Sequence, residues 1–449
     1  MTTVVVGAGP AGVRAVQCLL AHGLSPVWID EAARPGGQIY RRPPPAFRRT
    51  HKTLYGFEAG KARRLHAAAE AAAGAADYRS NTLAWDVADG AVHVTGPGGP
   101  EALAYDNLIL ATGAMDRILP IPGWTLPGVF TLGGAQIALK AQACAIGRRS
   151  ILLGTGPLLY LVAYQYAKAG ATVACVLDTS PAEARLGALP RLLAQPGTMA
   201  KGLHYIAWLR ARGIRLHEGI DPLRILGNDR AEGVSFRDRA GKAREIGGDA
   251  VAIGFGLKPE TQLAELAGCR FGFDAPSRQW LPMTDDQGRA EGAPGIYLAG
   301  DGAGIAGAAA AELAGERAAL ALLADLGRRV PAPRTQAIGR RLARIGRFRA
   351  GLEAAFPYPA VLARGAADDT ILCRCEAVTV GTLRAAARDD AEEINRAKAI
   401  CRVGMGRCQG RICGGPAAEV FAAARGVDLA AAGRLRAQPP IKPLPLAWL

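Results

Sequence analysis

Long apolar segments are absent from this chain of 449 residues. No run of about eighteen apolar residues is free of charge, so the sequence predicts no transmembrane helix. The opening residues, MTTVVVGAGPAG, lack the basic segment and cleavage site of a secretory leader, which favours the cytoplasm and leaves attachment to the inner face of the membrane open. Aromatic residues are scarce at 6%, whereas half of the residues are apolar and 57 are glycine. This composition is typical of an α/β protein with two or three domains.

Two patterns of catalytic side chains are also missing. Residues 1–330 contain no C-x-x-C or C-x4-C pair, the dithiol through which thioredoxin and lipoamide reductases pass electrons, so the sequence argues against those activities. The six histidines form no pattern with serine and aspartate that is typical of hydrolases. The catalytic residues are therefore unknown from the sequence.

Acidic residues are absent from residues 328–349, where eight arginines occur, and the whole chain has a net charge of +15. No helix-turn-helix, zinc-finger or RNA-binding motif accompanies these arginines. The sequence therefore predicts a solvated basic segment, or a face that docks an acidic partner, and no nucleic-acid partner.

The nine cysteines are distributed unevenly. A disulfide framework is not expected in a cytoplasmic chain. Four cysteines stand alone and are predicted to be small buried apolar residues: Cys18, Cys144, Cys175 and Cys269. The other five crowd into residues 373–413.

A nucleotide-binding pattern opens the chain. An apolar strand runs into Gly7-x-Gly9-x-x-Gly12, an apolar-periodic helix follows, and a second strand ends at Asp30. The glycines allow a tight turn, backbone approach to a pyrophosphate and close packing of helix on strand. The helix N-terminus favours the negative phosphates, and Asp30 lies where a carboxylate can accept hydrogen bonds from a ribose. The sequence predicts a bound dinucleotide here.

Three further stretches resemble motifs of thioredoxin-reductase-like and trimethylamine-dehydrogenase-like flavoproteins: EAARPGGQIYR (31–41), DNLILATGA (106–114) and PGIYLAGDGAGIAGAAAAELAGERAAL (294–320). The resemblance implies that the dinucleotide is FAD and that Asp301 meets its ribityl–phosphate portion. Alone, Asp301 is equally typical of a helix N-cap. The FAD-contacting set expected from the four stretches is Gly7, Gly9, Gly12, Asp30, Glu31, Gly37, Gln38, Thr112, Gly113, Gly300 and Asp301.

A second nucleotide-like pattern covers residues 150–178. Gly154 and Gly156 match the first two glycines and Asp178 ends the next strand, but Leu159 replaces the third glycine. Two such folds, one inserted in the other, resemble two-dinucleotide-binding-domain flavoproteins, whose second fold takes NAD(P)H. Because a bulky leucine disturbs the phosphate-binding geometry, another nucleotide or no ligand is favoured over NAD(P)H.

The cysteine spacing predicts a metal centre. Cys373-x-Cys375 precedes Cys408-x4-Cys413 by 32 residues that are mainly helical and can fold as a hairpin. Four thiolates suit zinc or an iron–sulfur cluster. A C-x-C pair strains a tetrahedral zinc chelate, so the cluster is favoured and zinc stays open.

This pattern, with its GMGRCQGRIC run, resembles the 2Fe–2S domain of bacterioferritin-associated ferredoxin. The resemblance makes Cys373, Cys375, Cys408 and Cys413 the ligands and leaves Cys401 spare. Arginines beside the ligands would offset the negative charge of the cluster: Arg374, Arg402, Arg407 and Arg411.

The sequence thus predicts an α/β flavoprotein with two nested Rossmann-like folds and a small helical 2Fe–2S domain. The proposed units are an FAD domain (1–115 and 285–330), a second nucleotide-binding-like domain (120–284), a basic linker interrupted by prolines (331–367), a cluster domain (368–428) and an extended tail (429–449).

Essentially the whole chain resembles the α-type subunits of bacterial multi-subunit flavin dehydrogenases, the group of opine oxidases, D-hydroxyproline and proline dehydrogenases, and cyanide-forming glycine dehydrogenase. This resemblance implies a β subunit that oxidises the C–N bond of an amino or imino acid, a hetero-oligomer with a small third subunit left open, and FMN or a second nucleotide at the subunit interface as an open addition. The alternatives are a self-sufficient NAD(P)H-dependent flavin reductase and a non-enzymatic scaffold.

Overall fold

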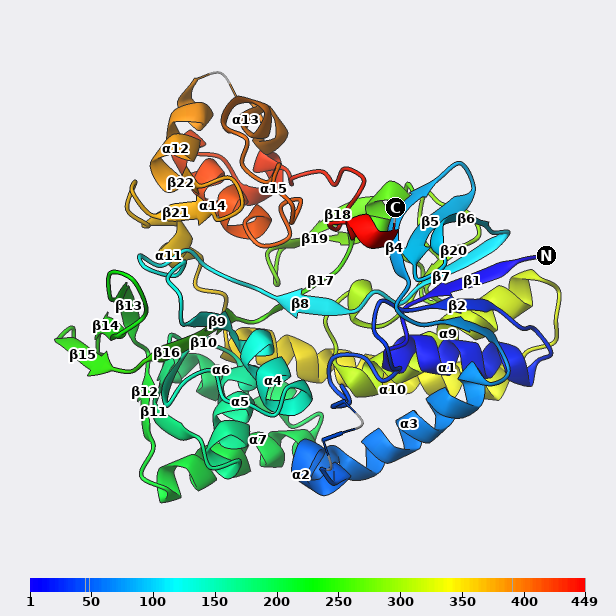
Figure 1. Ribbon diagram of the computed structural model, residues 1–449, viewed down its shortest axis with the longest axis horizontal. Helices are drawn as coiled ribbons and strands as arrows, with labels where there is room; N and C mark the ends of the chain where they lie inside the picture. The colour runs from blue at the N-terminus through cyan, green and yellow to red at the C-terminus, as the bar shows by residue number, and fades with distance from the viewer. Residues whose placement is uncertain (45, 48, 390, 449) are drawn as a thin grey trace.

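The computed structural model describes residues 1–44, 46–47, 49–389 and 391–448. Two parallel sheets with flanking helices lie side by side, and a small helical unit that contains the cysteines sits above the junction between them (Figure 1). The nested Rossmann-like folds predicted from the sequence are confirmed. Within the described part of the chain, no helix is both long enough and apolar enough to cross a membrane.

The first fold is built from two distant parts of the chain. Its sheet has the order β20-β7-β1-β2-β3, and all neighbouring strands are parallel. The central strand β1 (Thr3–Val6, TVVV) is buried along its whole length, as expected for a parallel strand covered on both faces. The other strands are β2 (Val27–Ile29), β3 (Asp77–Arg79), β7 (Asn107–Leu110) and β20 (Ile296–Leu298).

Helices α1 (Pro10–Ala21) and α9 (Ala308–Asp325) pack closely on this sheet. A Cβ atom on Gly315 would lie 2.0 Å from the carbonyl oxygen of Ala11, so the small residues of the alanine-rich α9 permit the contact. The remaining elements of this region are α2 (His51–Tyr55), the short helix η1 (Gly56–Glu58), α3 (Ala59–Ala73) and the antiparallel strands β4 (Leu83–Ala88), β5 (Ala91–Gly96) and β6 (Gly99–Ala104).

The second fold has the strand order β12-β11-β10-β16-β9, again parallel. Its strands are β9 (Val129–Thr131), β10 (Arg149–Thr155), β11 (Thr172–Asp178), β12 (Arg215–Glu218) and β16 (Ala250–Phe255), and its helices are α4 (Leu132–Ala141), α5 (Pro157–Lys168), α6 (Ala182–Leu192) and α7 (Pro196–Ala211). A three-stranded antiparallel sheet projects from one side (Figure 1); it contains β13 (Asp221–Leu226), β14 (Gly233–Arg237) and β15 (Ala243–Gly247).

The chain passes between the folds twice, through β8 (Ala114–Asp116) and β17 (Leu257–Pro259), which form an antiparallel pair. The returning segment continues into α8 (Gln262–Leu266) and the hairpin of β18 (Phe271–Asp274) and β19 (Gln279–Pro282). It then reaches β20 and the short helix η2 (Gly300–Gly302). The two crossing strands therefore lie at the junction of all three units (Figure 1).

Residues 331–367, predicted as a proline-interrupted basic linker, are largely helical, which corrects the expectation of an irregular segment. Helix α10 (Ala332–Ala355) spans 24 residues and packs against α6. Pro331 is its N-cap, and Pro333 lies in its first turn, where a proline loses no helical hydrogen bond. The other two prolines follow the helix and precede α11 (Ala360–Arg364).

The cysteine-bearing unit contains a two-stranded pair and four helices: β21 (Ile371–Cys373), β22 (Val378–Thr379), α12 (Val380–Arg388), α13 (Ile394–Cys401), α14 (Gly414–Arg425) and α15 (Leu429–Ala432). Its apolar core is continuous with that of the second fold. Of the four cysteines predicted to be buried, Cys175 and Cys269 are buried and Cys18 is half-buried, but Cys144 is exposed. It follows α4 in a turn, outside any apolar periodic pattern.

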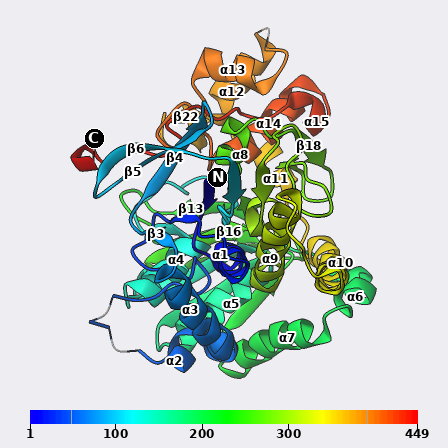
Figure 2. The same ribbon diagram turned by 90° about the vertical axis from the view of Figure 1, so that its right-hand side faces the viewer.

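After α15 the chain is irregular and returns to the first fold, where it ends in η3 (Leu446–Trp448) beside β4, β5 and β6 (Figures 1 and 2). The Ile441 amide donates to the carbonyl of Trp85 in β4, and the Lys442 ammonium pairs with Glu31. Ala437 and Ile441 are buried. The tail therefore connects the cysteine-bearing unit to the first fold; Leu449 lies outside the described residues.

Candidate functional site

The first glycine loop is tightly packed. A Cβ atom on Gly12 would lie 1.8 Å from the carbonyl oxygen of Gly7, and one on Gly7, where φ is +105°, would lie 2.4 Å from the carbonyl oxygen of Ala111. Glycine is therefore required at both positions for helix α1 to pack against β1 and β7. No side chain caps the N-terminus of α1, so its first amides remain available to an anionic ligand.

Asp30 lies directly beneath this loop. Its carboxylate accepts hydrogen bonds from the amides of Ala8 and Ala32, the latter at 2.7 Å. Burial raises the pKa of Asp30, and the two amide bonds oppose the rise. The acid thus braces the glycine loop, and each of its oxygens keeps a lone pair for a further donor.

The Gly-Gly-Gln stretch lies against the same loop. The Gly36 amide donates to the carbonyl of Ala8 at 2.8 Å, and a Cβ atom on Gly37 would lie 2.7 Å from the Cα atom of Gly9. Gln38 is exposed, and its side-chain oxygen accepts from Arg41. This juxtaposition was predicted only through the flavoprotein resemblance.

The late glycine–aspartate motif completes this region. A Cβ atom on Gly302 would lie 2.5 Å from the hydroxyl oxygen of Thr112, so η2 packs directly on the turn that contains Thr112 and Gly113. The Oδ1 atom of Asp301 accepts from the amides of Ala306 and Gly307, each at 2.8 Å. It therefore orders the loop before α9 but is not the N-cap of that helix, which is Gly307, and its Oδ2 atom makes no hydrogen bond within the described residues. All eleven predicted residues lie at the carboxyl edge of one parallel sheet, and their glycines, amides and acids suit a dinucleotide.

In the second fold, the acid at the end of the second strand of the motif, Asp178, has different surroundings from Asp30 in the first fold. Asp178 is fully buried, and its Oδ2 atom accepts from the Tyr160 hydroxyl at 2.7 Å and pairs with Arg185 at 2.5 Å. The Arg185 guanidinium also lies 5.1 Å from the ring centroid of Phe356, which follows α10. Internal partners thus occupy the position where a ribose would bind.

Leu159 stands where the third glycine of the motif would be. Its side chain is completely buried in the apolar core between α5 and the sheet. Gly154 is still required, because a Cβ atom there would lie 1.8 Å from the carbonyl oxygen of Gly254, whereas nothing lies within 4 Å of such an atom on Gly156. The residues present do not fit NAD(P)H, and the fold is retained without an accessible ribose acid.

Replacing Arg185 with alanine should destabilise the chain by about 3 kcal/mol, because it removes the cation that compensates the buried Asp178 carboxylate. Burial already raises the pKa of Asp178. Stability that depends on the protonated form is present at low pH and lost as pH rises through the raised pKa, so the defect should be largest at neutral pH and shrink toward pH 4. Urea unfolding at several pH values measures it.

The double variant Arg185→Ala, Asp178→Asn serves as the control, since it removes the stranded charge and should recover part of the loss. A defect in the single variant that does not change with pH would contradict the assignment of the pair.

The four predicted cysteine ligands come together in two pairs. Cys373 contacts Cys413, and Cys375 contacts Cys408, so that each pair combines one thiol from either end of the helical hairpin. Cys401 is half-buried and belongs to neither pair. A Cβ atom on Gly406 would lie 2.3 Å from the Cβ atom of Cys375, which explains why the run GMGRC needs a glycine there.

Cys373 is set up as a thiolate. The hydrogen bond from the Cys413 thiol lowers the pKa of Cys373 to about 6, and the amides of Gly404, Glu376 and Cys375 act in the same direction. That same hydrogen bond raises the pKa of Cys413, which keeps the shared proton. Two of the predicted neighbouring arginines are used in ion pairs, Arg402 with Glu376 at 2.9 Å and Arg411 with Glu260 at 3.7 Å, while Arg374 and Arg407 are exposed.

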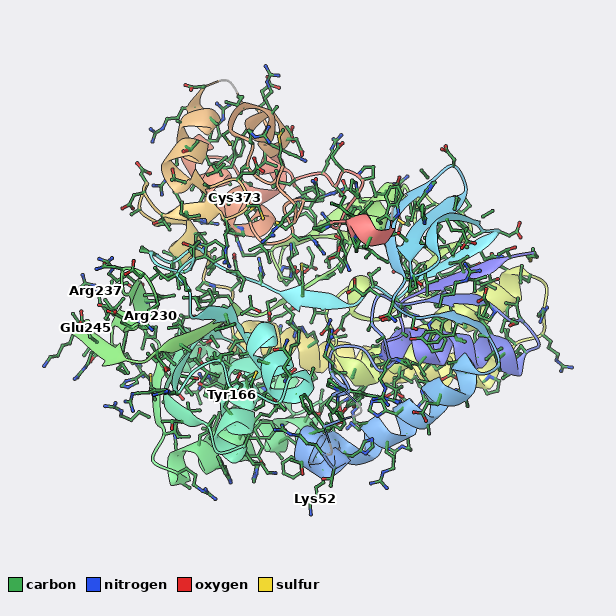
Figure 3. All side chains as sticks on the ribbon, viewed as in Figure 1. Lys52, Tyr166, Arg230, Arg237, Glu245 and Cys373 are labelled. Atoms are coloured by element: carbon green, nitrogen blue, oxygen red, sulfur yellow. The ribbon has the colours of Figure 1, made fainter. Side chains whose placement is uncertain are left out.

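The four thiols are arranged as two neighbouring pairs. Among the residues that the structure describes, no three His, Cys, Asp or Glu side chains converge on one point. A zinc ion needs four donors around one centre, whereas a 2Fe–2S cluster takes two cysteines at each iron. The four cysteines thus supply thiol donors of the kind that both centres use, arranged as two pairs. Figure 3 places Cys373 within the small helical unit.

A segment that the sequence did not identify joins the two sites. The Thr112 hydroxyl donates to the carbonyl of Glu260 at 2.5 Å, and the Glu260 amide donates to the carbonyl of Gly113 at 2.9 Å. On the other side, the carboxylate of Glu260 pairs with Arg411, and the side-chain amide of Gln262 donates to the carbonyl of Gln409 at 2.8 Å. Residues 258–262 thus contact both the Thr112 turn and the cysteine loop.

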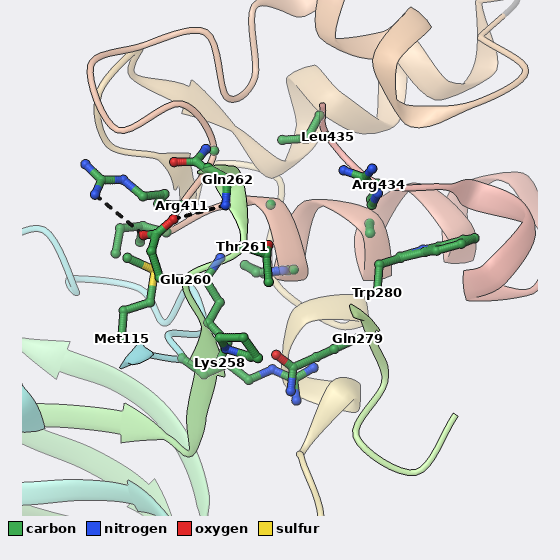
Figure 4. Close-up of a pocket in the computed structure, with 18 of the residues that line it drawn as sticks. Met115, Lys258, Glu260, Thr261, Gln262, Gln279, Trp280, Arg411, Arg434 and Leu435 are labelled. Carbon is green, nitrogen blue, oxygen red and sulfur yellow. Dashed lines mark hydrogen bonds and ion pairs between the residues drawn. The ribbon is translucent and has the colours of Figure 1, made fainter. Parts of the chain in front are cut away.

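A cavity of about 130 Å³ lies beside this segment. Figure 4 shows Glu260 and Gln262 next to Arg411 on one side of it, and Trp280 with Arg434 on the other. The Gln262 side-chain oxygen and the Trp280 indole nitrogen are buried without a hydrogen-bond partner in the described part of the chain. Polar groups thus remain unsatisfied at the junction of the three units.

Comparison with known proteins agrees with this geometry. Residues 1–318 match the family described as pyridine nucleotide-disulphide oxidoreductase, and residues 369–449 match the sarcosine oxidase A3 domain. The second match includes the cysteine-bearing unit and the tail.

Full-length relatives are also found. The opine oxidase A-type subunit of Agrobacterium tumefaciens is 39% identical, with 99% of this chain and 90% of the relative aligned. The HcnB subunit of hydrogen cyanide synthase from Pseudomonas aeruginosa is 34% identical, with 99% and 97% aligned. The crystal structure of L-proline dehydrogenase from P. horikoshii has the same fold, with a TM-score of 0.72 at 20% identity over 100% of this chain and 79% of that one. The chain therefore belongs to the FAD-binding pyridine nucleotide-disulphide oxidoreductase family and aligns over its full length with the A-type subunit of opine oxidase and with HcnB.

Proposed function

We propose that this chain is the electron-transferring flavin and iron–sulfur subunit of a multi-subunit dehydrogenase that oxidises the C–N bond of an amino or imino acid. The single observation that carries the proposal is the segment 258–262, which touches the Thr112 turn with one side and the cysteine loop with the other. Opines, hydroxyproline, proline and glycine are the substrate class, by relation to the opine oxidase and HcnB chains.

In this proposal FAD lies along the carboxyl edge of the first sheet. The free amides at the N-terminus of α1 bind the pyrophosphate, Asp30 accepts from the adenosine ribose, and Asp301 accepts from the ribityl hydroxyls through its open Oδ2 atom. Gly37 and Gly113 allow the backbone to approach the ring. When bound, FAD accepts a hydride equivalent and releases electrons singly.

The four cysteines hold a 2Fe–2S cluster, which stores one electron at a time. Supporting this assignment, the thiols lie in two pairs, Cys373 is poised as a thiolate, and Gly406 lets the loops meet. Residues 258–262 keep the two cofactor sites in fixed contact across a short stretch of protein. The role of this chain is to bind, orient and shield the two carriers.

Substrate oxidation is assigned to a partner subunit, because no catalytic constellation for an amino acid is found in the described residues of this chain. The exposed arginines of α10, among them Arg340, Arg341 and Arg347, offer a basic face to an acidic partner. FMN or a second nucleotide at the subunit contact stays a proposal, as does a small third subunit.

Anaerobic stopped-flow spectroscopy of the complex purified from its native source tests the proposal. We expect an amino or imino acid substrate to bleach the flavin and reduce the cluster only when the partner subunit is present. NADH should reduce neither, since Asp178 is occupied by Arg185 and Tyr160. Rapid stoichiometric bleaching by NADH would instead establish a self-sufficient NAD(P)H-dependent reductase, and substrate oxidation by the isolated chain would refute the division of labour.

A further inference from the structure

Helix α6 exposes three apolar side chains on one side. Leu186, Leu189 and Leu193 are 70%, 43% and 57% exposed. Their spacing of three and four residues places them along one face of the helix, which we call the leucine stripe. Another side of α6 is already used, because Ala188 and Leu192 are buried in an apolar core that α6 shares with α10. The leucine stripe is therefore left facing solvent.

The neighbouring helix α10 exposes arginines next to α6. Arg340, Arg344 and Arg347 are exposed, and none of them makes an ion pair in the part of the chain that the structure describes. The Nε atom of Arg344 donates to the carbonyl of Ala194 at 2.7 Å, one residue after Leu193. Figure 2 shows α6 and α10 together at the outer edge of the molecule. A basic border thus adjoins the C-terminal end of the leucine stripe.

Negative charge is scarce on this surface. Residues 328–349 contain eight arginines and neither an acid nor a lysine. The one acid of α6, Glu183, is paired with Arg239. Arginine binds a carboxylate through two parallel N–H bonds and is enriched at protein–protein interfaces, where lysine is depleted. The surface therefore complements the carboxylates of a protein.

We propose that the leucine stripe of α6 and the exposed arginines of α10 together form the docking surface for the substrate-oxidising subunit. That subunit presents an apolar helix or loop flanked by aspartate and glutamate side chains. The inference rests on the proposed function, because that function assigns substrate oxidation to a partner. The leucines supply a centre from which water is excluded, and the arginines supply a charged border that fixes the orientation of the partner.

An anionic bilayer is the other occupant that leucine and arginine side chains could suit. Only the exposed parts of the three leucines can enter a bilayer, so they bury less than one myristoyl chain, whose own membrane binding is marginal and reversible. Helices α6 and α10 also contain no tryptophan or tyrosine, the residues that anchor proteins at membrane interfaces. These observations favour a protein partner.

Affinity measurements with the partner subunit, separated from the native complex, test the inference. We expect the double variant Leu186→Asn, Leu193→Asn to raise the dissociation constant about 30-fold, because two apolar contacts at the centre of the interface are lost. Arg347→Glu should raise it about tenfold, since an attraction becomes a repulsion. The same variant should make the dissociation constant less dependent on salt concentration than it is for the wild type.

Val361→Asn and Arg230→Glu are the matched controls. Val361 of α11 is 70% exposed, as Leu186 is, and Arg230 is an exposed arginine in the loop between β13 and β14 (Figure 3). Both variants should bind the partner subunit with wild-type affinity. Flavin content and the thermal unfolding midpoint show whether each variant is folded. If the double variant is not, Leu186→Asn alone takes its place.

Three outcomes would contradict the inference. Wild-type affinity in both the leucine and the arginine variants would overturn it and leave the proposed function standing. Variants that keep the partner subunit but lose binding to vesicles of phosphatidylcholine and phosphatidylglycerol would overturn it in favour of a membrane surface. A wild-type chain that purifies from its native source without a second subunit would overturn the proposed function and the inference together.

Discussion

Cys373→Ser should abolish iron binding while FAD stays bound. The protein is expected to lose essentially all of its iron and acid-labile sulfide, because the buried Cys373 thiol is one of the four proposed ligands and a 2Fe–2S cluster would need all four. Electron transfer to a one-electron acceptor should fall by several orders of magnitude. Iron analysis, the visible spectrum and acceptor reduction give three separate readouts.

Cys401→Ser is the matched control, since this thiol lies in the same unit, is half-buried and belongs to neither pair. Its iron content and electron transfer should equal those of the wild type. The cysteine assignment would be wrong if Cys401→Ser lost iron to the same extent, or if Cys373→Ser kept a full cluster.

Gly12→Ala should give a protein without FAD, or one that does not fold. The added Cβ atom would meet the carbonyl oxygen of Gly7 at 1.8 Å, a contact with rigid backbone that cannot relax without moving α1 away from β1. The amides at the start of α1 would move with it, so the phosphate-binding edge would be lost. Extracted flavin per chain and the thermal unfolding midpoint measure the two consequences.

Gly60→Ala tests the same substitution in the same fold without the clash. Gly60 lies in α3, has no positive φ, and the nearest atom to an added Cβ is the end of the Arg64 side chain at 3.8 Å. Gly60 is the second residue of the helix, where alanine is at least as favourable as glycine, so flavin content should be unchanged and stability equal or higher. Normal flavin content in Gly12→Ala would refute the close-packing argument.

In both sites, the residues that are close together in the sequence could be predicted, because they form a short motif. Gly7, Gly9 and Gly12 with Asp30 are fixed by one strand–turn–helix–strand unit, and the structure assembles them as expected. The C-x-C and C-x4-C stretches likewise predicted a helical hairpin that brings thiols together, and α12 and α13 form it. Such motifs can be recognised in the sequence because a few positions accept only glycine for steric reasons.

Contacts between distant segments could not be predicted in the same way. Glu260 and Gln262 belong to no motif, and their importance arises from partners at positions 112–113 and 409–411. The ion pair between Asp178 and Arg185 could not be predicted either, because the motif includes the aspartate but not the arginine seven residues later. Tertiary packing decides which of several compatible roles a residue takes.

In the arginine-rich segment 331–367, the prolines led to a prediction that the structure does not bear out. Its prolines predicted an irregular linker, but they lie at the ends of α10, and the interior is free of them. Phe348, Ala355 and Gly351 bury one side of the helix against α6, and a Cβ atom on Gly351 would lie 2.9 Å from the Cβ atom of Arg191. A proline in the sequence can therefore lie at the end of a helix as readily as it can interrupt one.

The returning tail has a consequence for biosynthesis. Strand β20 and the Asp301 loop are added to the first fold only after the second fold has been translated, and Ile441 and Lys442 reach Trp85 and Glu31 only after the cysteine-bearing unit has been made. The domain that is synthesised first is thus the last to be finished. Nascent chains should therefore bind FAD only after these late segments emerge from the ribosome, so that a prematurely ended product should carry no flavin.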